Sequence, residues 1–193
     1  MNSAENIRNA FKVVNKTYEN INKMMNYCKT IADEGNEYVV SVPKFLRYKS
    51  DNEFDGWLIN DFILIFQSKE DEGLENEWRN GPIYVLDIDF NYEDTPKIYL
   101  SKFEYKNIES WSKGCSPANH WRFYWPVRNL EYMKCIDTYG YEIWTPKKGK
   151  ESAADNSYWG IKKAVCYTEE LIDINAENIK EKIFDRFTWL KDK

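Results

Sequence analysis

The amino-acid sequence predicts an α+β fold: a long N-terminal helix, then a largely antiparallel, curved sheet of about six or seven strands, then a C-terminal helix. Three observations predict it. Apolar residues recur at helical spacing before residue 35 and again after residue 175, and the segment between them is rich in β-branched and aromatic residues. At 193 residues the chain is expected to form one domain (1–193), with helices over 3–34 and 175–191 and a β-rich core over 38–167.

The N-terminal helix is the clearest element. Ser3 is a suitable N-cap and Gly35 a suitable stop. Between them an apolar stripe recurs at alternating steps of four and three residues: Ile7, Phe11, Val14, Tyr18, Ile21, Met25 and Cys28. Two interpretations stay open. The stripe packs on the chain's own sheet, or it forms a coiled-coil contact with a second copy or a partner, so the chain is a monomer or a homodimer.

Seven segments with strand composition follow, over residues 37–42, 57–68, 83–92, 97–107, 120–127, 141–145 and 158–167. Helical crossovers between them are mostly absent, which favours antiparallel pairing. The polar stretch 147–157 is expected to be the least ordered. The C-terminal helix can be capped by Asn175 and carries its own stripe, formed by Ile179, Ile183, Phe187 and Leu190.

The segment HWRFYWPV (120–127) predicts a strand whose odd-numbered aromatic residues enter the core. His120, Arg122 and Tyr124 then share the other face, with Arg128 at the same parity. Arginine forks suit carboxylate or phosphate groups, so this face is a candidate pocket for an anion or a partner. The alternative is that the arginines pair with the chain's own acids, Asp87 or Asp89.

Residues 83–106 predict a hairpin that turns at Asp94-Thr95 and places Leu86 opposite Phe103. The acids of its first strand are expected on a solvated face. Asp89 followed by Glu104 and Lys106 resembles the short pattern of PD-(D/E)xK nucleases, although the proline and the following helix are missing. A metal-dependent, nuclease-like enzyme is therefore one alternative, using Asp87, Asp89, Glu104 and Lys106.

The numbers and spacing of the cysteines and the single histidine limit which catalytic mechanisms the chain can use. One histidine excludes mechanisms that need two, and Cys115 with His120 is the remaining thiol–imidazole pair. The four cysteines are widely spaced, which favours reduced thiols in a cytoplasmic protein. No secretory signal or membrane-length apolar run is present, and no glycine-rich phosphate loop occurs. We therefore expect no membrane association, no catalytic residue, no metal and no cofactor.

Charge is distributed unevenly. Residues 51–94 hold thirteen acids against two bases, and the remaining residues carry a net charge of +6. This asymmetry disfavours direct nucleic-acid binding. The densest acidic run contains Glu70, Asp71, Glu72, Glu75 and Glu77.

These charges favour a non-catalytic, intracellular protein-binding module, acting as an inhibitor or immunity-type protein that occludes a basic partner with an acidic surface. A nucleic-acid-processing enzyme or a toxin is such a partner. The abundance of Asn, Lys, Ile and Tyr is typical of a low-GC bacterium or its phage. A further alternative is a binder of a small ligand, a nucleotide or a sugar, on an aromatic-lined sheet.

Overall fold

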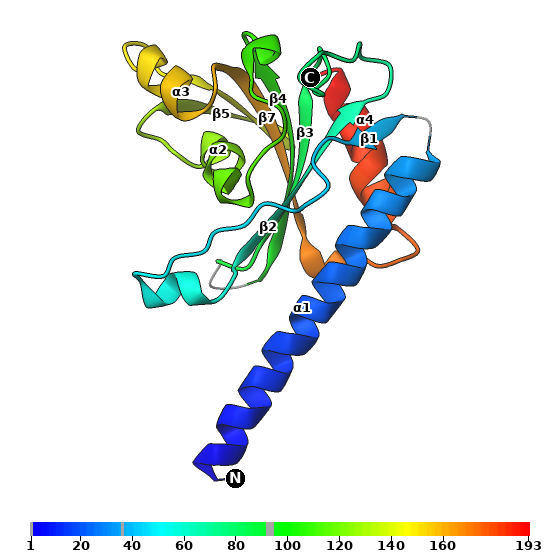
Figure 1. Cartoon of the computed structure of the whole chain (residues 1–193), viewed down its shortest axis with the longest axis vertical. Helices are drawn as coiled ribbons and strands as arrows, with labels where there is room; N and C mark the ends of the chain where they lie inside the picture. The colour runs from blue at the N-terminus through cyan, green and yellow to red at the C-terminus, as the bar shows by residue number, and fades with distance from the viewer. Residues whose placement is uncertain (1, 36, 92–94) are drawn as a thin grey trace.

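The computed structural model of the chain describes residues 2–35, 37–91 and 95–193, and it confirms the α+β fold (Figure 1). Within these residues one antiparallel sheet holds seven strands in the order β1-β2-β3-β4-β7-β6-β5. The strands are β1 (Tyr38–Val40), β2 (Asp61–Ser68), β3 (Ile83–Asp89), β4 (Lys97–Tyr105), β5 (Met133–Thr138), β6 (Tyr141–Pro146) and β7 (Ile161–Glu170).

Helices at the two ends of the chain cover one face of the sheet (Figure 1). They are α1 (Ser3–Glu34) and α4 (Arg186–Lys191), the latter preceded by a π-helical segment, Lys180–Asp185. The C-terminal helix therefore begins later than predicted, although the Asn175 side chain does accept hydrogen bonds from the N–H groups of Glu177 and Asn178. The predicted stripe is fully buried against the sheet at Ile179, Ile183, Phe187 and Leu190.

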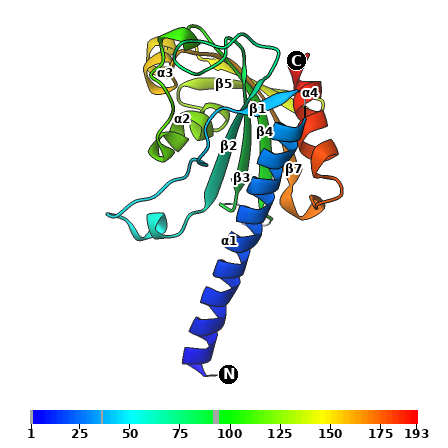
Figure 2. The ribbon, with the colours of Figure 1, turned by 45° about the vertical axis from the view of Figure 1, so that its right-hand side comes forward.

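Only part of α1 packs on the sheet. Ile21, Met25 and Cys28 are buried, whereas the N-terminal half projects beyond the strands, and there Ile7 is 60% and Phe11 63% exposed (Figures 1 and 2). The N-cap is Asn2 rather than Ser3, because its side chain accepts the N–H of Glu5. None of the described helices combines the length and hydropathy that crossing a membrane requires.

The predicted strand 120–127 is wrong, because this segment is helical. Short 3₁₀ turns, Pro117–His120 and Trp125–Val127, flank the single α-turn α2 (Trp121–Tyr124). Ser116 and Asn119 form a capping box around Pro117, which starts a helix rather than a strand. The odd-numbered residues therefore do not all enter the core as predicted: Trp125 is 45% exposed, whereas Phe123 and Val127 are buried.

Two other segments also differ from the prediction. Strand β5, at one edge of the sheet, has only Met133 buried, and its mixed polar sequence gave little sign of a strand. The stretch 147–157, expected to be least ordered, contains the helix α3 (Glu151–Ser157), which is anchored by the buried Ala154.

The register of the β3–β4 hairpin differs from the prediction. Leu86 lies opposite Leu100 rather than Phe103. This is a shift of three residues along β4. Because neighbouring residues of a strand point to opposite faces of the sheet, an odd shift moves each β4 side chain to the other face, and Ile98 and Leu100 lie beneath the helices. Because β3 is central, all its described side chains are buried, so the expected solvated acidic face is wrong. Residues 92–94, including part of the predicted turn at Asp94-Thr95, lie outside the described residues.

Candidate functional site

Strand pairing brings three aspartates together on the sheet face opposite α1. Asp61 on β2 is the direct cross-strand partner of Asp89 on β3, and Asp87 is the next residue on the same face. Their exposed fractions are 3% for Asp61, 1% for Asp87 and 0% for Asp89. Buried carboxylates are costly unless they are paired or protonated, so their partners determine what this region can do.

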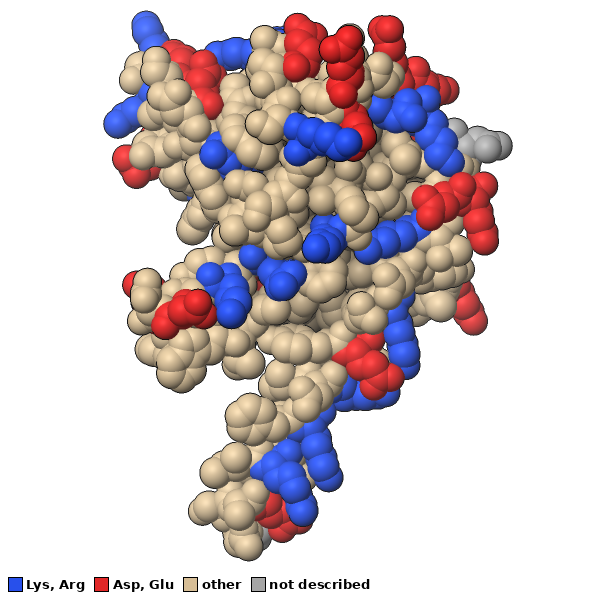
Figure 3. Space-filling view, viewed as in Figure 1, with Lys and Arg blue, Asp and Glu red and all other residues tan. Residues whose placement is uncertain are grey.

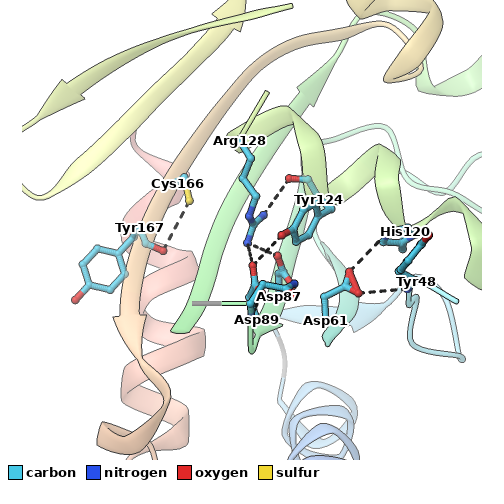
Figure 4. Close-up of polar contacts among 10 residues, drawn as sticks. Tyr48, Asp61, Asp87, Asp89, His120, Tyr124, Arg128, Cys166 and Tyr167 are labelled. Carbon is cyan, nitrogen blue, oxygen red and sulfur yellow. Dashed lines mark hydrogen bonds and ion pairs between the residues drawn. The ribbon is translucent and has the colours of Figure 1, made fainter. Parts of the chain in front are cut away.

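Arg128 is the partner of two of these acids (Figure 4). Its Nη2 donates to Asp87 Oδ2 at 2.7 Å and to Asp89 Oδ2 at 3.1 Å. The guanidinium lies 3.9 Å from the ring centres of both Tyr99 and Tyr124, and Tyr124 Oη donates to Asp89 at 3.1 Å. Burial raises the pKa of Asp87 to about 7, against the opposing charge of Arg128. The sequence left open the alternative that the arginines pair with the chain's own acids, and Arg128 does so.

Asp61 is less completely satisfied. Its Oδ1 accepts the N–H of Tyr48 at 3.2 Å. Its Oδ2 lies 3.7 Å from His120 Nε2, and it accepts no hydrogen bond from any described residue (Figure 4). Burial raises the pKa of Asp61, which His120 opposes, and burial lowers the pKa of His120, which Asp61 opposes. The fold thus holds a buried carboxyl oxygen that faces an imidazole but accepts no hydrogen bond from the described residues.

A pocket of about 970 Å³ opens above this pair. Asp61 and His120 form its floor, and Arg47 and Lys49 bring positive charge to it. Tyr48, Tyr124 and Trp125 lie around it, with the ring centres of His120 and Tyr48 5.5 Å apart. Its size and mixed lining are those of small-molecule sites.

The four residues of the predicted anion pocket do not share one face. His120 and Tyr124 line the pocket, and Arg128 lies buried beneath it. Arg122 is separate: it donates to the carbonyl of Ser157 at 3.0 Å and lies between the rings of Trp121 and Trp159. Sequence reasoning missed Asp61, although an acid directly before the apolar run FILIF was a usable signal.

The nuclease-like residues are not brought together. Asp87 and Asp89 bind Arg128, whereas Glu104 pairs with Lys102 at 3.3 Å and Lys106 with Asp155 at 2.6 Å. Glu104 lies seven residues along β4 from Lys97, the partner of Asp89, or about 23 Å along the strand. The described residues contain no group of three or more His, Cys, Asp or Glu arranged to hold a metal ion. The geometry gives this alternative no support.

The thiol of Cys115 is not activated. It hydrogen-bonds to Ser116 O and Asn119 Oδ1 at 3.6 and 3.7 Å, and burial raises its pKa to about 12. Nucleophilic cysteines have a lowered pKa, so this arrangement does not favour a thiol–imidazole pair with His120.

The acidic run 70–77 lies in a firmly held loop. Glu70 pairs with Lys191 and Glu77 with Lys113, whereas Asp71 is partly buried. Glu72 and Glu75 are exposed. On the face drawn in Figure 3, acidic and basic side chains are interleaved over much of the surface. The charge asymmetry of the sequence is therefore partly cancelled by lysines from other elements.

No protein-family model matches the chain, and neither a curated protein nor a solved structure shows significant similarity to it. Buried ionisable side chains of the chain meet around Asp61, His120 and Arg128.

Proposed function

We propose that this chain is a nucleotide-binding protein, which takes a planar heterocycle joined to a phosphate into the pocket above Asp61 and His120. The observation that carries this proposal is a pocket with aromatic walls and cations whose lining includes the buried Asp61, and the Oδ2 of Asp61 accepts no hydrogen bond from the described residues. Each of these three features matches one part of a nucleotide.

The aromatic walls suit the base. Tyr48 is 38% and Trp125 45% exposed, so both rings have faces available beside the pocket. Stacking of a nucleobase on an aromatic ring stabilises binding by about 1–3 kcal/mol. Because every base has a flat face, stacking alone would not select one base.

The floor suits the polar edge of the ring. The Asp61 carboxyl accepts an N–H when it is ionised and donates a proton when it is neutral, and burial raises its pKa. A ring that offers an amino group or a protonated ring nitrogen would give this oxygen the hydrogen bond that it lacks among the described residues. This satisfies the general requirement that buried polar groups be hydrogen-bonded.

The cations suit the phosphate. Arg47 and Lys49 lie on the segment that leads into β2, and both line the pocket. Lys49 pairs with Asp51 at 3.3 Å, but both side chains are well exposed, so this ion pair contributes little stability and can be exchanged for a phosphate.

Tryptophan fluorescence tests the proposal, because Trp121 and Trp125 line the pocket. A nucleoside monophosphate is expected to change the emission of the intact chain. Lys49→Ala should weaken binding of the monophosphate about tenfold, equivalent to about 1.4 kcal/mol, and leave binding of the uncharged nucleoside unchanged. Asp61→Asn should weaken binding of both the monophosphate and the nucleoside, because it removes an acceptor oxygen.

Lys148→Ala is the matched control, since Lys148 is an exposed lysine that does not line the pocket. The proposal is wrong if no nucleotide changes the emission, or if Lys148→Ala weakens binding as much as Lys49→Ala does. A response to neutral sugars in place of nucleotides would favour the sugar alternative.

The acidic loop supports a second candidate, the non-catalytic inhibitor or immunity-type module that occludes a basic protein. The observation in its favour is that contacts within the chain already hold the acidic loop in one conformation. Trp78 is 2% exposed and donates to Ser112 O at 3.0 Å, and the Asn76 amide donates to the carbonyls of Ile108 and Trp111 at 2.9 and 3.0 Å. Glu77 has a φ of 69°, a left-handed conformation that these contacts maintain. A loop that is already ordered loses little entropy on binding.

For this candidate, neutralising all five carboxylates is expected to slow association with an identified basic partner by at least about tenfold at low salt, without changing folding. The substituted residues are Glu70, Asp71, Glu72, Glu75 and Glu77. Biolayer interferometry measures the rate, and Glu131→Gln with Asp137→Asn, on another exposed surface, is the control. Unchanged association of the five-fold variant would rule out the acidic-surface mechanism.

A further inference from the structure

The strand β5 lies at the edge of the sheet, on the side away from α1 and α4 (Figure 1). In an antiparallel strand, alternate residues direct their N–H and C=O groups to opposite sides of the strand. The N–H of Lys147 donates to the carbonyl of Tyr132 at 2.8 Å, and Pro146, which has no N–H, lies opposite Met133. The even-numbered residues of β5 therefore bond to β6, and the main-chain groups of the odd-numbered residues point outward.

The outward main-chain groups of β5 belong chiefly to Cys135 and Asp137. Among the described residues, neither makes a main-chain hydrogen bond on the side away from β6. Natural proteins protect an exposed edge with prolines, bulges or several charges. β5 contains one Lys, one Asp and no Pro, and its pairing with β6 shows no register shift. This edge is therefore open to another strand.

A row of apolar side chains also ends at this edge. Val165, Ile143 and Ile136 lie opposite one another on β7, β6 and β5, on the face of the sheet that the terminal helices cover. Val165 is fully buried, Ile143 is half-buried and Ile136 is 46% exposed. The row becomes more exposed toward the edge, so an apolar side chain from an added strand would extend it.

We propose that β5 pairs with β5 of a second copy of this chain and joins the two seven-stranded sheets into one. The two strands run antiparallel about a two-fold axis that passes between the two Ile136 residues. Cys135 of each copy then exchanges main-chain hydrogen bonds with Asp137 of the other, which satisfies the outward groups of both copies. The two Ile136 side chains meet at the intervening non-hydrogen-bonded position, where opposite side chains are closest.

The side chains of β5 complement those of a second copy in this register. Lys134 lies opposite Thr138 of the other copy, and Cys135 lies opposite Asp137, so no two like charges face each other directly. Glu142, a further acid beside this edge, lies on β6 opposite Asp137 of its own copy and therefore away from the axis. This self-complementarity is the argument for a second copy as the occupant. The pairing is independent of ligand binding in the pocket.

Analytical ultracentrifugation of the full chain tests the dimer. Because the contact is small, the wild-type chain is expected to dimerise with a dissociation constant of about 10–100 μM. Ile136→Lys should raise this constant at least about tenfold, because it places two cations opposite each other at the axis. Ile172→Lys is the matched control, since Ile172 is 70% exposed and lies outside β5, and it should leave the dimer intact. Circular dichroism should show that both variants fold.

Mixing two variants tests the two-fold pairing itself. Ile136→Glu alone should associate as weakly as Ile136→Lys, whereas an equimolar mixture of the two should form heterodimers, because lysine then faces glutamate across the axis. A wild-type chain that stays monomeric at about 500 μM, or an Ile136→Lys chain that dimerises as well as wild type, would overturn the proposal. A mixture that associates no better than either variant alone would also overturn it.

Discussion

Replacing Arg128 by alanine is expected to lower the free energy of unfolding by about 3–5 kcal/mol, because it leaves two buried carboxylates without their cation. Asp87 and Asp89 are 1% and 0% exposed, and both accept from Arg128 Nη2. The substitution also removes the group that lies between the rings of Tyr99 and Tyr124. Urea unfolding followed by circular dichroism measures the loss.

Arg122→Ala is the control for this experiment. Arg122 lies between two tryptophan rings and hydrogen-bonds to carbonyl groups, and no described carboxylate pairs with it. Its replacement should cost about 1 kcal/mol. Adding Asp87→Asn to Arg128→Ala should recover part of the loss, because one buried charge is then gone. Equal costs for the two arginines would contradict the assigned role of Arg128.

Stability is expected to fall as the pH rises from about 4 to 7, through the titration of Asp87. Its pKa is about 7 in the folded chain, against about 3.9 for an unfolded aspartate, so between these values the folded state binds more protons than the unfolded state. The contribution of Asp87 to stability is therefore full below pH 4 and lost as the pH approaches 7. Between pH 5 and pH 8 the decrease is at most about 2–3 kcal/mol.

Urea unfolding of the wild-type chain and of Asp87→Asn at the two pH values isolates this effect. Asparagine cannot ionise, so the variant should lose most of the difference and should be the more stable protein at pH 8. His120 acts in the opposite direction, because its lowered pKa favours the unfolded state as the pH falls, but it contributes to both proteins. A variant with the full wild-type pH dependence would show that Asp87 does not titrate in this range.

The sequence was sufficient where one periodicity extended over a long segment. The stripe from Ile179 to Leu190 predicted buried residues, and the stripe from Ile7 to Cys28 predicted the helix, though not that it leaves the sheet. It was insufficient for residues 120–127, because a short aromatic run has no reliable period. The register of β3 and β4 also failed, since it depends on β2 and β7 packing on both sides.

The residues of the candidate site could likewise be predicted only in part from the sequence. The sequence suggested that arginines pair with Asp87 or Asp89, and Arg128 does so because it follows the helical segment directly above them. Arg122 does not, because successive residues of a helix turn by about 100° and even-numbered residues do not share a face. Asp61 joins the site only through its register opposite Asp89, which no local pattern encodes.

His120 gives the most direct test of the proposed nucleotide site. It is the chain's single histidine, so its ring signals in an NMR spectrum are assigned without mutagenesis. In the free chain the imidazole is expected to titrate below its ordinary pKa of 6.5, because it is buried. Adding a nucleoside monophosphate should shift these signals in the wild-type chain, and the same ligand concentration should shift them less in Asp61→Asn. Imidazole signals that stay in place at saturating nucleotide would contradict the assignment of this pocket.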